Sequence, residues 1–269
     1  MISLPQIFGF DIDGTLLRSD GSLSKRVCGS IRAVTENGST VVLSTGRPWS
    51  QVRHIADKLG VVEFSVCLNG ATIHAFDGSL LRQNSMNQEQ ALAALEVARK
   101  LIPGVALGAD MPDGSHIWET DFTHDFPADF DVDALVIPDA SQFIAGPVLT
   151  WLLDCKNMQP SLAIELLDKS LPPGLEIRPS GLETPEIAVK GVSKASGLAT
   201  VAEMQDIPAS AACVFGDGLN DLAMFQWAGE SIAMGNSHPQ VLSLANRVAP
   251  TNDEDGVAIV LESLLERFS

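Results

Sequence analysis

Short apolar runs near the start of the chain show no alternation with polar residues. They cover residues 7–10, 40–43 and 64–68. A strand buried on both faces has this pattern, and such strands belong to parallel sheets. Between the runs, apolar residues recur every three or four positions, as in helices that pack on a sheet. Ser24 and Pro48 suit the starts of these helices, and Gly38 and Gly60 suit their ends. The alternating order predicts a doubly wound parallel α/β sheet.

The pattern changes after residue 71. Two short runs around the Asp77-Gly78 turn predict a hairpin, and an apolar stripe predicts a helix over residues 87–101. Residues 120–139 are rich in aspartate and proline, so we expect them to be irregular. The other predicted elements here are strands at 105–109, 116–119, 148–155, 175–178 and 186–189 and a helix at 161–167. This mixture is typical of an α+β domain.

The last third of the chain returns to alternating helices and strands. Helices are predicted at 193–204, 221–228, 239–245 and 257–268, and strands at 211–215 and 231–234. We therefore expect a discontinuous α/β core, built from residues 1–83 and 188–269, with an α+β domain inserted over residues 84–187.

The charge balance limits the possible partners. The 269 residues are 45% apolar, which is enough for a packed core, and 17 basic against 34 acidic residues give a formal net charge of −17. Such a chain repels nucleic acid and anionic membranes, so we expect neither as a partner. The acidity also favours solubility. Any phosphate site in this chain must create its own positive field.

The cysteines and the N-terminus indicate a cytoplasmic protein. Cys28, Cys67, Cys155 and Cys213 are far apart and form no C-x-x-C pair, so we expect neither a zinc site nor a disulfide framework. The first residues lack the basic segment of a signal peptide, and no apolar run reaches the roughly 18 residues of a membrane span. The pattern carries no signal for an oligomeric state.

Two acidic clusters follow predicted strands. Asp11 and Asp13 come after the first strand, and the run from Gly216 to Asp221 comes after the strand at 211–215. The carboxyl ends of parallel strands share one sheet edge, where ligands bind. Each cluster alone is also compatible with an ordinary turn, but two acidic loops at one edge require a cation between them. Mg²⁺ suits such oxygen ligands.

Two further segments suit an anion. Thr45 and Gly46 follow the second strand, offering a hydroxyl and an open backbone at the start of the helix after Pro48. Lys194 begins a helix, where its charge opposes the helix dipole unless an anionic site lies nearby. A plain strand-to-helix turn and a solvated lysine are the alternatives for these segments.

Together these segments resemble the four motifs of the haloacid dehalogenase superfamily, in the same order. They are Asp-Ile-Asp-Gly-Thr at 11–15, Ser-Thr-Gly-Arg at 44–47, Lys194 and Gly-Asp-Gly-Leu-Asn-Asp at 216–221. Asn69-Gly70-Ala71, Ala-Met-Gly-Asn at 233–236 and Asn-Asp-Glu-Asp-Gly-Val at 252–257 are similar to the Cof-like, type IIB branch. The insert lies where that branch carries its cap domain.

The resemblance implies a magnesium-dependent phosphatase and assigns roles to its residues. Asp11 would be the nucleophile and Asp13 the general acid and base, while Thr45 and Lys194 would bind phosphoryl oxygens. It implies metal binding by Asp11, the Asp13 backbone carbonyl, Asp217 and Asp221, the last through water or as a support. Asn220 would reach the phosphate, and Gly46, Arg47 and Asn69 would line the substrate site.

The insert is expected to choose the substrate. His116 and Trp118 share one strand face, where they line the substrate space or pack an edge strand. Lys156 and Arg178 are scattered, which disfavours bisphosphates. We expect a small phosphate ester, with sugar phosphates first and nucleotide-like or vitamin phosphates such as pyridoxal phosphate or flavin mononucleotide next. A phosphomutase and a non-catalytic ligand-binding protein are the alternatives.

Overall fold

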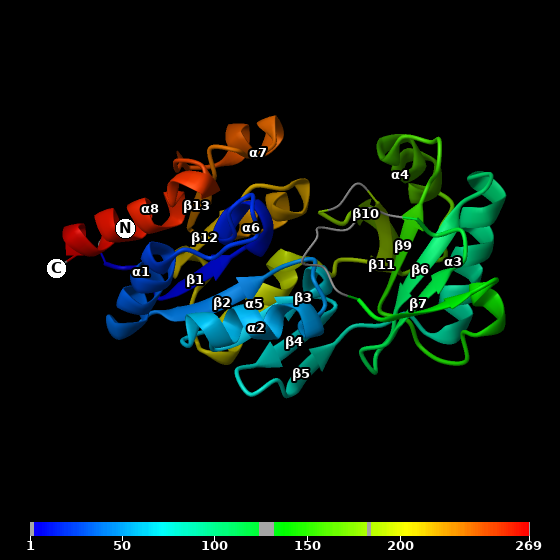
Figure 1. Ribbon diagram of the computed structural model, residues 1–269, viewed down its shortest axis with the longest axis horizontal. Coiled ribbons are helices and arrows are strands. Elements are labelled where there is room, and N and C mark those ends of the chain that lie inside the picture. Colours follow the sequence, from blue (N-terminus) through cyan, green and yellow to red (C-terminus); the bar gives the residue numbers. More distant parts are fainter. Residues whose placement is uncertain (1–2, 124–131, 182–183, 269) are drawn as a thin grey trace. The chain divides into compact units, whose positions relative to one another are not determined.

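The structure is a computed structural model that describes residues 3–123, 132–181 and 184–268 (Figure 1). The chain divides into two compact units, Met1–Leu81 with Ser193–Ser269, and Arg82–Val192. The boundaries lie a few residues from those predicted at 83/84 and 187/188. The role of the second unit in substrate choice stays a prediction.

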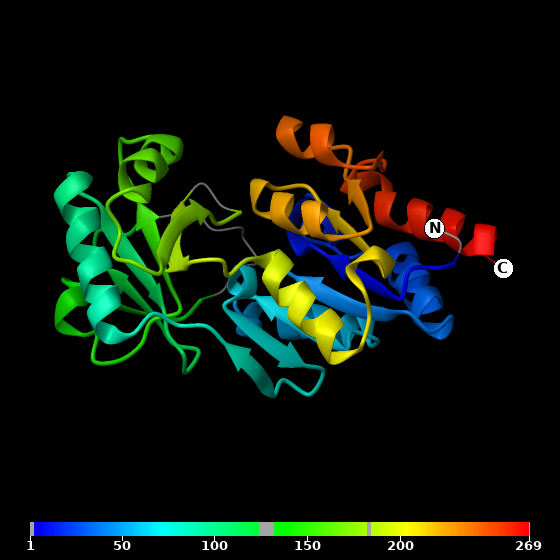
Figure 2. The same cartoon turned by 180° about the vertical axis from the view of Figure 1, so that it is seen from behind.

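The first unit is built on an eight-stranded sheet (Figures 1 and 2). Its strands, in spatial order, are β14 (Arg247–Val248), β13 (Glu230–Ala233), β12 (Ala212–Gly216), β1 (Ile7–Phe10), β2 (Thr40–Ser44), β3 (Phe64–Cys67), β4 (Thr72–Ala75) and β5 (Leu80–Gln83). The first six are parallel, and β4 runs antiparallel to β3. The prediction of a doubly wound parallel α/β core is confirmed.

Helices cover both faces of this sheet. They are α1 (Lys25–Glu36), α2 (Trp49–Leu59), α5 (Lys194–Met204), α6 (Leu222–Trp227), α7 (Pro239–Leu244) and α8 (Gly256–Phe268). One apolar cluster joins the sheet to α1, α2 and α8, and another joins it to α5, α6 and α7. Ser24 caps α1 by accepting a hydrogen bond from the Val27 amide, and Gly60 ends α2 in the left-handed conformation.

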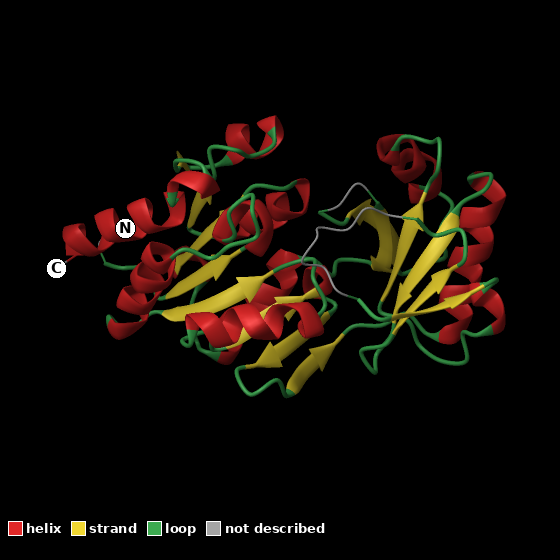
Figure 3. Cartoon of the chain, in the orientation of Figure 1, coloured by secondary structure: helices red, strands yellow, loops and turns green. Residues whose placement is uncertain are grey.

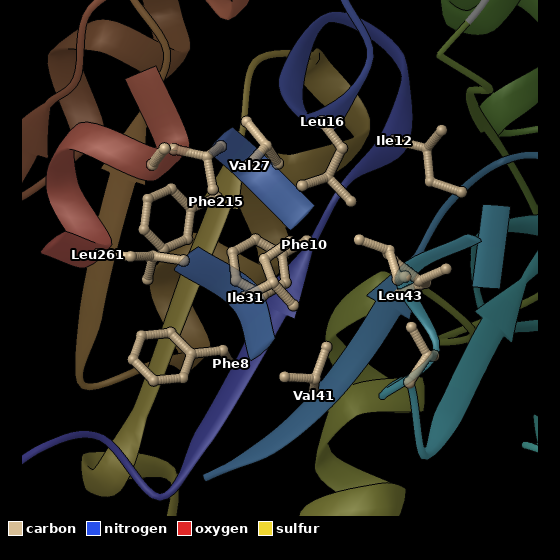
Figure 4. Close-up of a cluster of buried hydrophobic side chains, with 14 of the residues drawn as sticks. Phe8, Phe10, Ile12, Leu16, Val27, Ile31, Val41, Leu43, Phe215 and Leu261 are labelled. Carbon is tan, nitrogen blue, oxygen red and sulfur yellow. The ribbon is translucent and has the colours of Figure 1, made fainter. Parts of the chain in front are cut away.

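Alternate residues of β1 show how the first cluster is built (Figure 4). Phe8 and Phe10 point to the same face, and the ring of Phe10 stacks on Phe215 of β12 with the centroids 5.1 Å apart. Ile31 from α1 and Leu261 from α8 complete this layer. Burying such large side chains contributes about 1.5–3 kcal/mol each, so the cluster anchors β1 and the loop that follows it.

The second unit contains a six-stranded sheet (Figure 3). Its order is β10 (Leu175–Pro179), β11 (Pro185–Val189), β9 (Thr150–Asp154), β6 (Ala106–Asp110), β7 (His116–Glu119) and β8 (Ala134–Ile137). All neighbours are antiparallel except β7 and β8. The helices α3 (Gln88–Leu101) and α4 (Pro160–Asp168) pack on one face in a single apolar cluster.

The sequence pattern did not predict two of the strands. The stretch 120–139 was expected to be irregular, but β8 forms within it, and residues 124–131 of that stretch lie outside the described residues. Leu135 and Val136 of β8 are both exposed, so this strand lacks the usual alternation of buried and exposed side chains. The two-residue strand β14 is too short for any periodicity.

No helix in the described parts of the chain has the length and apolarity to cross a bilayer. All four cysteines are buried and free, as expected for thiols that act as small apolar side chains.

Candidate active site

The first two acidic motifs meet at the carboxyl edge of the first sheet. β1 and β12 are parallel neighbours, and their last paired residues are Phe10 and Phe215. Asp11 continues this register, and its amide donates a hydrogen bond to the Phe215 carbonyl at 3.0 Å. The chain therefore delivers Asp11 and the loop at Asp217 to adjacent positions because the strands before them are held side by side.

Lys194 lies between two carboxylates. Its Nζ is 2.7 Å from Asp11 Oδ1 and 2.6 Å from Asp221 Oδ1, and the lysine side chain is fully buried. Ser193 caps α5 by accepting a hydrogen bond from the Ser196 amide. The first turn of α5 thus carries a lysine that counters two negative charges, which explains why a cation is tolerated there despite the helix dipole.

Burial and crowding shift the protonation of these groups. Burial raises the pKa of Asp11 well above its usual range, and the negative charge of Asp221 adds to this effect against the pull of Lys194. Burial and Asp221 also raise the pKa of Asp217 to about 7. Burial favours the neutral amine of Lys194, but Asp11 and Asp221 outweigh it and raise the pKa of Lys194. The site gathers more negative charge than one lysine neutralises.

Three carboxylates form a group that can hold a cation. Asp11, Asp217 and Asp221 each offer an oxygen within 4.8 Å of the others. Thr15 Oγ1 donates to Asp217 Oδ1 at 2.8 Å, which orients that carboxylate. Hard oxygen donors, closely spaced and mutually repelling, fit Mg²⁺ or a similar divalent ion. The Asp13 side chain is not a member of this group, and its backbone carbonyl, which was predicted as a further metal ligand, stays a prediction.

Both oxygens of Asp221 already have partners. Oδ1 faces Lys194, while Oδ2 accepts hydrogen bonds from the amides of Asp217 and Gly218, both at 2.9 Å. This carboxylate is fully buried. Asp221 therefore orders Lys194 and the loop of Asp217 at the same time.

Two glycines in the acidic motifs are required by close packing. A Cβ at Gly14 would lie 2.3 Å from Asp217 Oδ2, and the φ of Gly14 is +71°. A Cβ at Gly216 would lie 2.5 Å from Asp221 Cγ. A side chain at either position would push the carboxylates apart, so these glycines serve the site rather than a turn alone.

Asp13 pairs with Arg47. Arg47 Nε and Nη2 donate to the two Asp13 oxygens at 2.8 and 2.6 Å. The arginine side chain is 2% exposed, whereas that of Asp13 is 49% exposed. The sequence pattern places Arg47 only among the substrate-lining residues and misses this pair. A bidentate pair fixes the orientation of both planar groups.

The remaining predicted residues form a neighbouring group. Asn220 Nδ2 donates to Asn69 Oδ1 at 3.0 Å, and the Asn69 amide donates to the Thr45 carbonyl at 2.9 Å. Thr45 is fully buried, and its Oγ1 accepts a hydrogen bond from the Arg47 amide across Gly46. Among the described residues, no hydrogen bond links Thr45 to Asp11 or Lys194.

Two asparagines support the first acidic loop. Asn236 Nδ2 donates to the Gly14 carbonyl at 2.8 Å, and Asn252 Nδ2 donates to the Leu17 carbonyl at 2.8 Å. The Asn252 amide donates to Asn236 Oδ1 at 3.1 Å, which links the two. Both lie in segments that resemble the Cof-like branch, but their contacts could not be inferred from spacing along the chain.

Comparison with known proteins identifies the family. The haloacid dehalogenase-like hydrolase family matches residues 8–261, so the chain belongs to this family. The predicted resemblance and the predicted hydrolase class are confirmed.

Individual relatives cover almost the whole chain. Phosphatase YwpJ of Bacillus subtilis (strain 168) is 26% identical over 97% of this chain and 100% of its own length. The 5-amino-6-(5-phospho-D-ribitylamino)uracil phosphatase YitU of the same strain is 25% identical over 97% and 98%. The fold matches that of the subclass IIB sugar phosphatase BT4131 with a TM-score of 0.79, at 20% identity over 96% and 98%. The prediction of a phosphatase is confirmed by these relatives.

Proposed function

We propose that this protein is a magnesium-dependent phosphatase that hydrolyses small phosphorylated metabolites through an aspartyl-phosphate intermediate. The observation that carries the proposal is the position of Asp11, whose carboxylate is buried, contacts Lys194 and belongs to the group of three carboxylates. A buried nucleophile beside a fixed cation can approach an anionic phosphate that the rest of this acidic chain repels.

Two transfers complete the reaction. An Asp11 oxygen attacks phosphorus while the bond to the alcohol breaks, and Asp13 gives the leaving oxygen its proton. Asp13 then takes a proton from water, whose oxygen attacks phosphorus as the Asp11–phosphorus bond breaks. Inorganic phosphate and the starting carboxylates result. Asp13 suits this role because its side chain is half exposed, whereas Asp11 is buried.

The other site residues bind the phosphoryl group and the metal or orient the catalytic side chains. Lys194 neutralises charge on Asp11 and the transferred group, and Thr45 and Gly46 meet the phosphoryl oxygens. Asp11, Asp217 and the Asp13 carbonyl would hold the metal, with Asp221 as a support because both of its oxygens are engaged. When bound, Mg²⁺ supplies positive charge for the phosphoryl oxygens. Arg47 acts as a positioning residue for Asp13.

The names of the relatives support the proposed substrate class. YitU is named for a substrate with a phosphorylated ribityl chain. We expect this chain to act on sugar or sugar-alcohol phosphates first and on nucleotide-like or vitamin phosphates next, with the second unit making the choice.

The test is phosphate release from para-nitrophenyl phosphate and from a metabolite panel, with and without Mg²⁺. Asp57→Asn, at an exposed helix position of the same unit, is the matched control for Asp11→Asn. We expect the control to match the wild type and Asp11→Asn to be inactive. Net release of inorganic phosphate distinguishes hydrolysis from isomer interconversion by a mutase. Undiminished turnover by Asp11→Asn would refute the mechanism.

A further inference from the structure

The segment that follows β13, residues 234–238, contacts both acidic loops of the first unit. The His238 amide donates a hydrogen bond to the Asp217 carbonyl at 3.0 Å. Ser237 is buried, and its Oγ donates to the Gly216 carbonyl at 3.3 Å. These bonds hold the backbone of the segment against the loop that carries Asp217.

Asn236 extends from this segment to the other acidic loop. Its Nδ2 donates to the Gly14 carbonyl at 2.8 Å, and its Oδ1 accepts a hydrogen bond from the Asn252 amide at 3.1 Å. The second bond decides which end of the side-chain amide faces Gly14. Asn236 is exposed, and a hydrogen bond that water can replace contributes little to the free energy of folding. The contact therefore matters more for the geometry of the loop than for stability.

A second contact joins the same two loops. Thr15, the residue after Gly14, donates from Oγ1 to Asp217 Oδ1 at 2.8 Å. The loops are thus joined once through Asn236 and once through Thr15, and the two contacts close a ring. This ring passes through Gly14, Asn236, His238, Asp217 and Thr15 and returns to Gly14.

Gly14 has little room to shift within the ring. A Cβ on Gly14 would lie 2.3 Å from Asp217 Oδ2, so its backbone is packed closely against that carboxylate. Asn236 holds the carbonyl of the same glycine. The peptide bond before Gly14 contains the Asp13 carbonyl, a proposed metal ligand, and the Asp217 carboxylate is another. Fixing Gly14 therefore restrains two proposed metal ligands relative to each other.

Metal ligands that repel one another need such a restraint. Asp11, Asp217 and Asp221 offer oxygens within 4.8 Å of one another, and like charges at this spacing push apart. Mg²⁺ demands a near-octahedral arrangement of its ligands, so ligands that drift apart must be brought back at a cost in affinity. Contacts that orient metal ligands from outside typically change metal affinity by about 10–100-fold.

We propose that Asn236 is a positioning residue for the metal site, because the ring to which it belongs holds the Asp13 carbonyl and the Asp217 carboxylate in the arrangement that Mg²⁺ requires. The inference rests on the proposed phosphatase function, in which these two groups are metal ligands. It extends that function by making the metal affinity depend on a residue outside the four motifs that carry the chemistry.

The experiment measures Mg²⁺ affinity of the full chain by calorimetry, together with kcat at saturating Mg²⁺ and Tm in EDTA. The matched control is Asn246→Ala. Asn246 Oδ1 accepts hydrogen bonds from the amide and the hydroxyl of Ser231, but it lies just before β14, at the amino edge of the same sheet. We expect Asn236→Ala to raise the Kd for Mg²⁺ about tenfold and to lower kcat by a smaller factor. The control should lower Tm and leave the Kd unchanged.

A second variant tests the ring itself. Thr15→Val removes the other contact between the loops and should also raise the Kd for Mg²⁺. Since both contacts act on the same two loops, the Kd of the Thr15→Val, Asn236→Ala double variant should differ from the product of the single effects by more than about twofold. Asn236 is exposed, so Asn236→Ala keeps the test valid if Thr15→Val folds poorly.

Each outcome decides one claim. A wild-type Kd for Mg²⁺ in Asn236→Ala, with only a lowered Tm, would overturn the proposal, because the asparagine would then support the fold alone. Effects that simply multiply in the double variant would overturn the ring. A wild type that binds Mg²⁺ but releases phosphate from no substrate would instead reject the proposed function, while calorimetry would still decide the role of Asn236.

Discussion

The two sheets hold their polar side chains in different places. In the first unit β1 and β12 are apolar throughout, and Asp11, Asp217 and Lys194 come just beyond strand ends or at a helix start. In the second unit Asp110, His116 and Arg178 lie within strands and face away from the helices. Functional residues in loops form short motifs that can be recognised in the sequence. Polar residues within strands alternate with core residues, so they form no such motif.

The largest expected effect is on the turnover number, and it should arise from a substitution at the first sheet and not from one in the second. Asp11→Asn should lower kcat by at least about 10⁴-fold, since loss of a nucleophile removes the whole pathway. Phosphate release with saturating substrate and Mg²⁺ measures this. Thr150→Val in the second sheet serves as the contrasting variant. If both substitutions reduce aryl phosphate turnover equally, the proposal that only the first sheet carries the catalytic residues is wrong.

Asp13→Ala should have a smaller effect. Loss of general acid and base catalysis costs about 10²–10⁴-fold in kcat. Magnesium affinity, measured by calorimetry, should change little because only the backbone carbonyl of Asp13 is proposed as a ligand. A lost metal site in this variant would contradict that assignment. Arg47→Met should reproduce part of the kcat loss, since it frees the Asp13 carboxylate from its bidentate partner.

Removal of metal should change the pH dependence of stability. The pKa of Asp217 is about 7 in the folded protein, above its ordinary value of 3.8. The folded state therefore holds a proton that the unfolded state has lost, so stability of the metal-free protein should fall as pH rises from about 4 to 7. Mg²⁺ needs the deprotonated carboxylates, so its stabilising effect should grow over the same range. Thermal melts with EDTA or Mg²⁺ check this, and a Mg²⁺ effect that shrinks with rising pH would contradict it.

The smallest expected effect concerns Thr150. Its Oγ1 donates to Asp110 Oδ2 at 2.5 Å, and Asp110 Oδ1 lies 2.7 Å from His116 Nδ1. Thr150→Val should lower the free energy of unfolding by about 1–3 kcal/mol, because a buried carboxylate loses one of its donors. Denaturant titration measures this change. An undiminished midpoint would show that the network does not support the sheet.

The fold and the site were predictable from the sequence only where short motifs mark them. The parallel core was predictable because its strands are short apolar runs and its glycines mark turns. The positions of the Asp11 and Asp217 motifs were predictable because each motif directly follows one of two paired strands. Strand β8 was missed because Leu135 and Val136 are exposed in an aspartate-rich stretch. The Arg47–Asp13 pair was missed because spacing along the chain does not report side-chain direction. Arg178 was noted as scattered charge, and only strand pairing places Glu186 directly across from it.

The most direct test of the proposed mechanism is to find the phosphoryl group on the protein. Asp13→Asn should form the aspartyl phosphate and then hydrolyse it slowly, since the base that activates water is missing. Rapid acid quench after mixing with substrate and Mg²⁺, followed by peptide mass spectrometry, locates the modification. We expect a phosphoryl group on Asp11 that is absent from the Asp11→Asn, Asp13→Asn double variant. Steady phosphate release with no phosphoryl group on Asp11 at any time would contradict it.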